Sequence, residues 1–126
     1  SSSESTCPGR IMFQMYVSGS YKTTCASSHT PAANTWYLVT GTYDQSSTGS
    51  LKIYINGSLA GTTPSVGTSP SYGPVTTSPI CIGSEPSSYA CGESSIYASA
   101  TIDDVRYYNR ALSGSEIQQL YNAGAK

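Results

Sequence analysis

The chain carries little charge of either sign. Charged residues make up only 10% of its 126 residues, and the formal net charge is −1. Such a chain offers no basic surface for nucleic acid or for an anionic membrane. No apolar run approaches the roughly 20 residues that cross a bilayer, and no charged-then-apolar leader opens the sequence. We therefore expect a chain with no membrane span of its own.

Residues suited to catalysis are also scarce. The only histidine, His29, lies in a polar loop, and the sequence has no Gly-x-Ser-x-Gly elbow, Gly-rich phosphate loop or Cys-x-x-Cys pair. Glu4, Glu85, Glu93 and Glu116 are scattered over a tail, loops and a helix start. Glycosidases instead need two carboxyl groups about 5–9 Å apart. We therefore expect no enzymatic activity and no cofactor.

The four cysteines point to an oxidising compartment, because a small, turn-rich chain with this cysteine content is typical of secreted domains. Four cysteines allow three pairings. We favour Cys81–Cys91, which would close a short loop, and Cys7–Cys25, which would tie the N-terminal tail to a hairpin. The alternative is a set of free, buried thiols.

The abundance of Ser, Thr and Gly predicts short strands joined by turns. Residues 1–10 form a flexible or disulfide-held tail, and residues 11–126 form one β domain. Asn56-Gly57 is a strong signal for a type I′ hairpin turn. Near the C-terminus, Ser113 and Glu116 match a capping box at the start of the only predicted helix. The predicted strands are 11–17, 21–25, 36–43, 51–55, 58–62, 79–83 and 100–108.

Three blocks of sequence carry a family resemblance. They are residues 36–44 (WYLVTGTYD), 51–57 (LKIYING) and 102–120 (IDDVRYYNRALSGSEIQQL). In this order and spacing they closely resemble the C-terminal half of the laminin-G-like, concanavalin A-like jelly-roll family. The resemblance implies an all-β fold: an incomplete laminin-G-like antiparallel β-sandwich with one short C-terminal helix, in which Trp36 packs between the sheets. Members are usually extracellular, and they bind glycans, proteins or calcium or serve as structural domains.

The resemblance also implies that strands are missing, because a family member normally has several strands before the position of Ile11. We therefore expect the apolar face of the sheet to remain open until a partner chain covers it, and the isolated chain to be aggregated or molten. Tyrosine, of which the chain has 11, suits such an interface. The predicted interface comprises Phe13, Met15, Val39, Ile53, Tyr107 and Tyr108.

One class of protein fits this expectation. The chain resembles the separately encoded globular subunit of a two-chain bacterial pilus, in which a helical pilin forms the filament core. This resemblance implies a non-enzymatic, secreted structural subunit in a cell-surface filament, with the pilin and copies of itself as partners.

The alternative is a carbohydrate- or matrix-binding module. Its exposed tyrosines would stack on sugar rings, and Asp44, Asp103 and Asp104 are the candidate calcium ligands. Neighbouring strand residues point to opposite faces, so Asp103 and Asp104 face one ion only across a bulge. Otherwise Asp104 pairs with Arg106 or Arg110, and Asp103 accepts backbone N–H groups.

Overall fold

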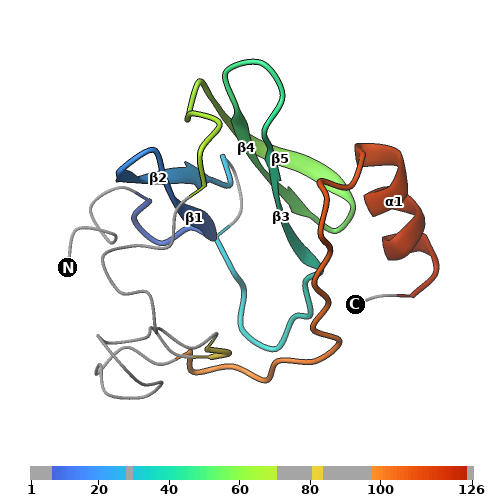
Figure 1. Ribbon diagram of the computed structural model, residues 1–126. Coiled ribbons are helices and arrows are strands. Elements are labelled where there is room, and N and C mark those ends of the chain that lie inside the picture. Colours follow the sequence, from blue (N-terminus) through green and yellow to red (C-terminus); the bar gives the residue numbers. More distant parts are fainter. Residues whose placement is uncertain (1–6, 28–29, 71–80, 84–97, 125–126) are drawn as a thin grey trace. The chain divides into compact units, whose positions relative to one another are not determined.

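A computed structural model of the chain describes residues 7–27, 30–70, 81–83 and 98–124 (Figure 1). The chain divides into two compact units, one made of Ser1–Ser71 with Tyr108–Lys126 and the other of Tyr72–Tyr107. The first unit contains β1 (Met12–Val17), β2 (Ser20–Cys25), β3 (Val39–Asp44), β4 (Ser50–Ile55), β5 (Ser58–Pro64) and α1 (Gly114–Asn122).

Strands β1 and β2 form an antiparallel hairpin that runs from the pair Met12–Cys25 to the pair Val17–Ser20. The turn consists of Ser18 and Gly19, whose φ angles of 50° and 79° are both positive. A two-residue turn with this geometry matches the twist of the flanking strands. Because successive side chains of a strand point to opposite faces, Phe13, Met15 and Val17 of β1 share one face, as the sequence predicted.

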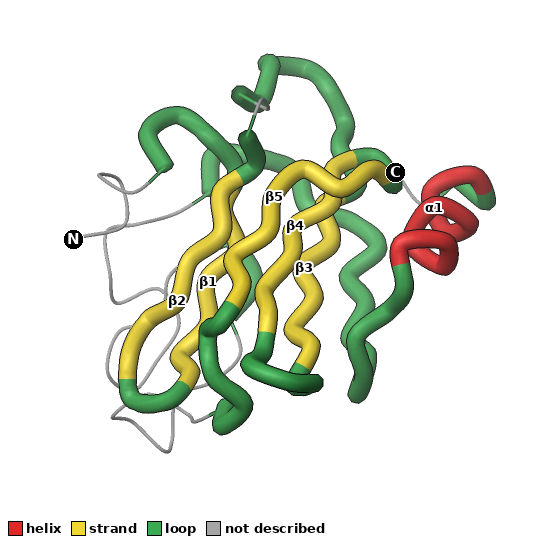
Figure 2. Tube along the Cα trace, turned by 90° about the horizontal axis from the view of Figure 1, so that it is seen from above, coloured by secondary structure: helices red, strands yellow, loops and turns green. Residues whose placement is uncertain are grey.

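The second sheet has the order β3-β4-β5 and is antiparallel throughout. Asn56 and Gly57 join β4 to β5 with φ angles of 50° and 81°, which confirms the predicted hairpin turn. The register shifts between Ile53, which pairs with Gly61, and Tyr54, which pairs with Leu59. Ala60 is thus the extra residue of a bulge. Figure 2 shows the strands of both sheets running side by side.

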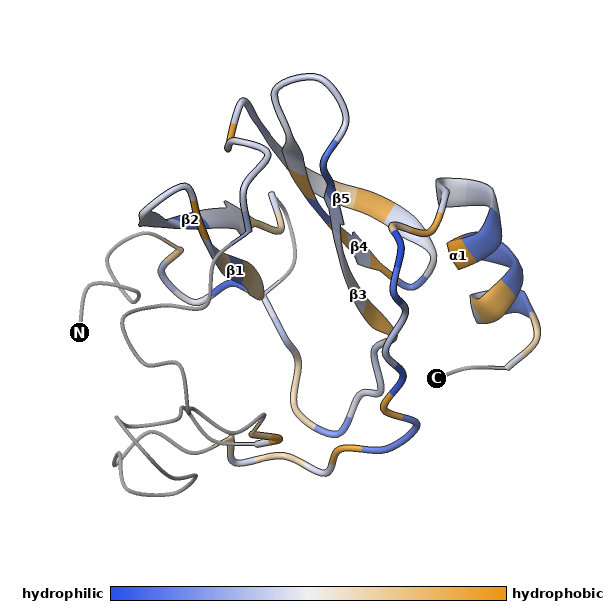
Figure 3. Cartoon of the chain, viewed as in Figure 1, coloured by the Kyte–Doolittle hydropathy of each residue, from blue (hydrophilic) through white to orange (hydrophobic). Residues whose placement is uncertain are grey.

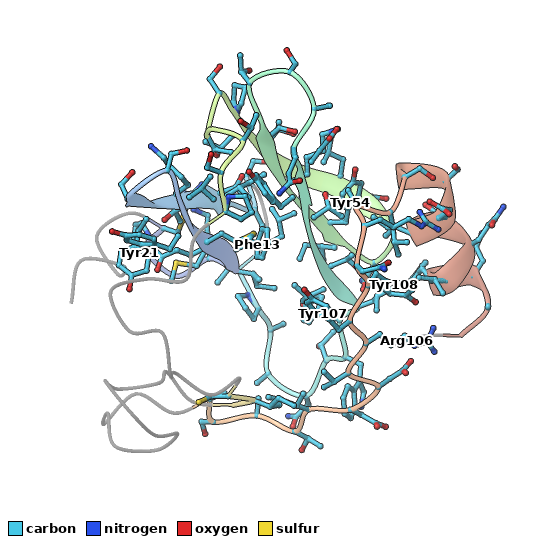
Figure 4. All side chains as sticks on the ribbon, in the orientation of Figure 1. Phe13, Tyr21, Tyr54, Arg106, Tyr107 and Tyr108 are labelled. Carbon is cyan, nitrogen blue, oxygen red and sulfur yellow. A yellow bond between two sulfur atoms is a disulfide. The ribbon has the colours of Figure 1, made fainter. Side chains whose placement is uncertain are left out.

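The β1–β2 hairpin covers one face of β4. Ile53 and Ile55 are buried there with Ala26 and Ala60, and the half-buried side chains of Ile11, Phe13 and Tyr37 pack against them. Figure 4 shows Phe13 directed from β1 toward the β3-β4-β5 sheet. The prediction that this apolar face is left open is therefore wrong for β4: the exposed fraction of Ile53 is 0%.

Helix α1 covers the opposite face of β4. Because neighbouring strand residues point to opposite sides, Tyr54 faces away from Ile53 and packs with Leu112, Ile117 and Leu120. The helix lies on the other side of the β3-β4-β5 sheet from the hairpin (Figure 1). Figure 3 shows that its apolar residues gather on one side. The predicted capping box is confirmed, since Ser113 accepts from the Glu116 amide and Glu116 accepts from the Ser113 amide.

The second unit contains residues 81–83 and 98–107 among those described. The Ala98 amide donates to the Gly83 carbonyl over 2.8 Å. The strand predicted at 100–108 is not formed, and 81–83 are not in a strand either; residues 79 and 80 lie outside the described residues. The reason at 100–108 is local, because Asp104 has a φ of 53°, in the left-handed region that interrupts an extended chain.

Candidate functional site

Two large apolar side chains are exposed where β3 begins. The exposed fractions of Trp36 and Val39 are 55% and 46%. We term these two residues the β3 surface. The approach to β3 is held in place by Asn56: the Leu38 amide donates to its Oδ1 and the Leu38 carbonyl accepts from its amide, both over 2.9 Å. Trp36 and Val39 are thus displayed from an anchored segment.

The apolar face of the β3-β4-β5 sheet is not covered at Val39. It pairs with Ile55, so the two side chains lie on the same face, yet Ile55 is fully buried and Val39 is half exposed. At the next position on that face, Phe13 lies directly over Gly41: a Cβ placed on Gly41 would be 2.5 Å from Phe13 Cδ2. The hairpin therefore covers the middle of β3 and leaves its start open.

One side of the β3 backbone has no strand partner among the described residues. The Leu38 carbonyl faces the turn after β4, so the even-numbered residues of β3 direct their N–H and C=O groups to β4. By alternation, the N–H and C=O groups of Val39, Gly41 and Tyr43 point away from β4. Among the residues that the structure describes, β3 pairs with β4 alone.

The predicted interface residues of the first unit differ in their exposure. Ile53 is buried and is excluded from any surface contact, whereas Phe13 and Met15 are half-buried and Val39 is exposed. Tyr107 and Tyr108 are exposed but fall in different units. Trp36 does not pack between the sheets, because more than half of it is exposed just before β3 begins.

The carboxylates proposed as calcium ligands have other contacts. Asp44 Oδ1 accepts from the Ser46 amide over 2.8 Å, and hydrogen bonding by Ser46 lowers the Asp44 pKa below its usual value. Asp103 Oδ1 accepts from the Asp104 amide. Both oxygens of Asp104 accept from the Arg106 guanidinium, each over 2.8 Å. The ion pair left open by the sequence is thus Asp104–Arg106.

The three aspartates as one calcium site stay a prediction, because Asp44 belongs to the first unit and the other two to the second. Within residues 7–27, 30–70, 81–83 and 98–124, no group of three or more His, Cys, Asp or Glu side chains lies close enough together to hold a metal. Hard cations such as calcium need six to eight clustered oxygens.

A second exposed feature escaped the sequence interpretation. On the outer side of the β1–β2 hairpin, Tyr16 and Tyr21 pair edge to face with ring centroids 5.0 Å apart. The Tyr16 hydroxyl donates to the Gly19 carbonyl over 2.9 Å, and the exposed fraction of Tyr21 is 64%. Alternation along the strand could have revealed it, because Met12, Gln14 and Tyr16 share this side. We term Met12, Gln14, Tyr16 and Tyr21 the outer hairpin face.

The disulfide predicted between Cys7 and Cys25 is present, with 5.7 Å between the two Cα atoms. Cys81 is disulfide-bonded as well. Its predicted partner, Cys91, lies outside the described residues, so that pairing stays a prediction. In the described part of the chain, no helix has the length and apolar character needed to span a membrane.

Comparison with known proteins is consistent with the fold. The chain is similar to a solved structure of residues 221–444 of an S-layer domain-containing protein from Clostridium thermocellum ATCC 27405, with 30% identity and a TM-score of 0.54. The match covers 90% of this chain but 52% of that one, so the chain spans about half the length of its structural neighbour. No curated protein matched.

The sequence comparison identifies the family. Residues 4–118 match the family described as the concanavalin A-like lectin/glucanases superfamily, in its laminin G form. This match covers the strands β1 to β5 and the first part of α1. The chain therefore belongs to the laminin-G-like branch of the concanavalin A-like superfamily.

Proposed function

We propose that the chain is a non-enzymatic extracellular structural subunit, a globular head that a helical pilin-type chain holds in a cell-surface filament. The observation that carries this proposal is the β3 surface, where Trp36 and Val39 remain exposed beside a fully buried core. Exposed apolar groups next to a well-packed layer are typical of protein interaction sites. The disulfide and the similarity to an S-layer domain-containing protein support a position outside the cell.

The burial of β4 limits what the partner has to cover. The chain itself supplies cover for both faces of that strand, through the hairpin and through α1. A partner helix therefore does not replace a whole sheet layer. It needs only an apolar stripe that packs on Trp36 and Val39, and the half-buried edge of Phe13 would extend the contact. A helix with apolar residues three or four positions apart provides such a stripe.

Co-purification with a helical pilin-type chain tests the proposal. We expect Val39→Asp to abolish capture of the head by the tagged helix, because it places a charge in an apolar contact. Leu59→Asp is the matched control: Leu59 is 55% exposed and pairs with Tyr54, so it lies on the α1 side of the sheet. Capture that survives Val39→Asp, or is lost equally in the control, would contradict the proposed surface.

A second function is favoured by the outer hairpin face. Exposed tyrosines beside polar side chains, here Gln14 hydrogen-bonded to Thr23 over 2.8 Å, are the groups that stack on sugar rings and bind their hydroxyls. This alternative is a glycan-binding module without calcium. Glycan-array binding that is unaffected by chelator, lost in Tyr21→Ala and kept in Val39→Asp would favour it over the filament subunit.

A further inference from the structure

The side of β3 that has no described strand partner lacks the features that usually protect an edge strand. Natural sheets shield such edges with lysine, proline, a bulge or an unusually short strand. Strand β3 has six residues, no lysine or proline and an unbroken register with β4, and its only charge is Asp44 at the end. In the part of the chain that the structure describes, no strand pairs with the N–H and C=O groups of Val39, Gly41 and Tyr43.

The sequence of β3 indicates which strand would pair there. It reads Val-Thr-Gly-Thr-Tyr from residue 39 to 43, with the two threonines placed symmetrically about Gly41. A two-fold interface requires a surface that is complementary to itself, and an antiparallel pair of identical strands has this property when the strand is symmetric about its centre. We propose that β3 pairs antiparallel with β3 of a second copy, centred on Gly41.

Hydrogen bonding defines the register. Backbone groups that point outward can bond only to groups that point outward on the other strand. Centring on Gly41 places it opposite Gly41 of the second copy and places Val39 opposite Tyr43 of the second copy. All three outward-facing residues of each strand then lie opposite an outward-facing residue. The two sheets join into one antiparallel sheet with the order β5-β4-β3-β3-β4-β5.

The side chains favour the same register. Val39 and Tyr43 form a β-branched and aromatic cross-strand pair, a combination that stabilises sheets, and the pair occurs twice. The Tyr43 hydroxyl donates to the Gly67 carbonyl over 2.8 Å, which restricts the ring within its own copy. A shift of two residues in one direction would instead place Gly41 opposite Tyr43 and Val39 opposite the polar Gln45. A shift in the other direction would place Val39 opposite Gly41 and Tyr43 opposite Tyr37.

Two further features permit the approach. Phe13 lies over Gly41 in each copy, so the two Phe13 rings come to neighbouring positions over the joint. Adjacent strands are about 4.8 Å apart, and aromatic rings pair favourably at about 4.5–7 Å. A net charge of −1 also gives copies little reason to repel each other. The pairing does not depend on the proposed filament role, since it needs no other chain.

Oligomeric state measured by native mass spectrometry and light scattering tests the pairing. We expect the wild-type chain to form a dimer and Val39→Pro to be a monomer. Proline removes an outward-facing N–H without removing a bond to β4, and its ring blocks an added strand. Leu59→Pro would disturb β5 itself, so Leu59→Lys serves as the control, and it should remain dimeric.

Disulfide trapping tests the register and decides the matter even if the proline variant fails to fold. Opposed residues in a hydrogen-bonded pair have Cα atoms about 5.5 Å apart, within reach of a disulfide. The variant with both Val39→Cys and Tyr43→Cys should therefore cross-link between copies. Val39→Cys alone should not, because the two copies of residue 39 are four positions out of register, or about 13 Å apart.

Three results would overturn the proposal. They are a wild-type monomer at about 1 mM, a concentration at which even weak specific contacts are populated, a folded Val39→Pro variant that still dimerises, and equal cross-linking of the single and double cysteine variants. None of these results bears on capture by a helical chain, so the filament proposal would remain to be judged by its own test.

Discussion

At the scale of single residues, the contact between Phe13 and Gly41 decides how the hairpin packs on β3. A Cβ at position 41 would lie 2.5 Å from Phe13 Cδ2 and 2.7 Å from Phe13 Cε2, closer than real side chains approach. We expect Gly41→Ala to lower the free energy of unfolding by about 1–3 kcal/mol, as overpacking of a core typically does. Urea unfolding measures the loss.

A double-mutant cycle provides the control for this contact. In a Phe13→Ala background the space above residue 41 is empty, so the additional cost of Gly41→Ala should largely disappear. If the two substitutions instead add independently, Phe13 does not lie over Gly41 and the packing of the hairpin described above is incorrect.

Individual residues also show what the sequence could and could not predict. Alternation correctly placed Ile53 and Val39 on the apolar face of their strands, because side-chain direction depends on the local chain alone. It could not show which part of that face is covered. Ile53 is buried by the hairpin and Val39 is left half exposed, an outcome that depends on the packing of segments far apart in the sequence.

At the scale of elements, the start of α1 is stabilised by charge as well as by its cap. Arg110 donates to both oxygens of Glu116, and Ser113 donates to Glu116 from its amide. Mainly through Arg110, and further through Ser113, these contacts lower the Glu116 pKa from 4.5 to about 2. A carboxyl group with a lowered pKa stabilises the folded state above its unfolded pKa and ceases to do so as the pH falls through its folded pKa.

We therefore expect the stability of the wild-type chain to decrease between pH 4.5 and about 2 partly through protonation of Glu116. In Glu116→Gln this part of the decrease should be absent, while the glutamine can still complete the capping box. Thermal unfolding measured across this pH range compares the two. Identical pH profiles would show that the Arg110–Glu116 pair does not stabilise the fold, and added salt should reduce the difference.

The elements differ in how far local sequence determines them. The turn at Asn56-Gly57 and the cap at Ser113 form as predicted, because each depends on a few neighbouring residues. The strand predicted at 100–108 fails for a reason that periodicity cannot detect. Asp104 adopts a left-handed conformation and binds Arg106 through both oxygens, and neither feature alters the apolar pattern.

At the scale of the whole molecule, the chain builds its main sheet between two layers of its own. The hairpin packs on one face of β4 and α1 on the other, so each face has its own buried cluster. This arrangement replaces the expectation of a bare sheet that cannot pack alone. It favours cooperative unfolding of the first unit.

The disulfide between Cys7 and Cys25 ties the N-terminal residues to this arrangement. It links positions 18 residues apart, and Cys7 is buried at the end of the hairpin. A cross-link over a loop of this length stabilises a small domain by about 3 kcal/mol, chiefly by restricting the unfolded chain. We expect the double variant Cys7→Ala with Cys25→Ala to unfold at correspondingly lower urea concentration.

Substitution is preferable to reduction in this experiment, because reducing agents would also act on the disulfide of Cys81. The variant should keep the β1–β2 register, since the hairpin is held by its own ladder and by the Ser18-Gly19 turn. Amide hydrogen exchange can separate the two effects: loss of protection confined to the residues before β1 would indicate a local tether, whereas loss across β1, β2 and β4 would indicate that the cross-link stabilises the whole first unit. We expect the second pattern, because Ile11 packs on the Ile53 cluster and its carbonyl accepts from the Ala26 amide, next to Cys25.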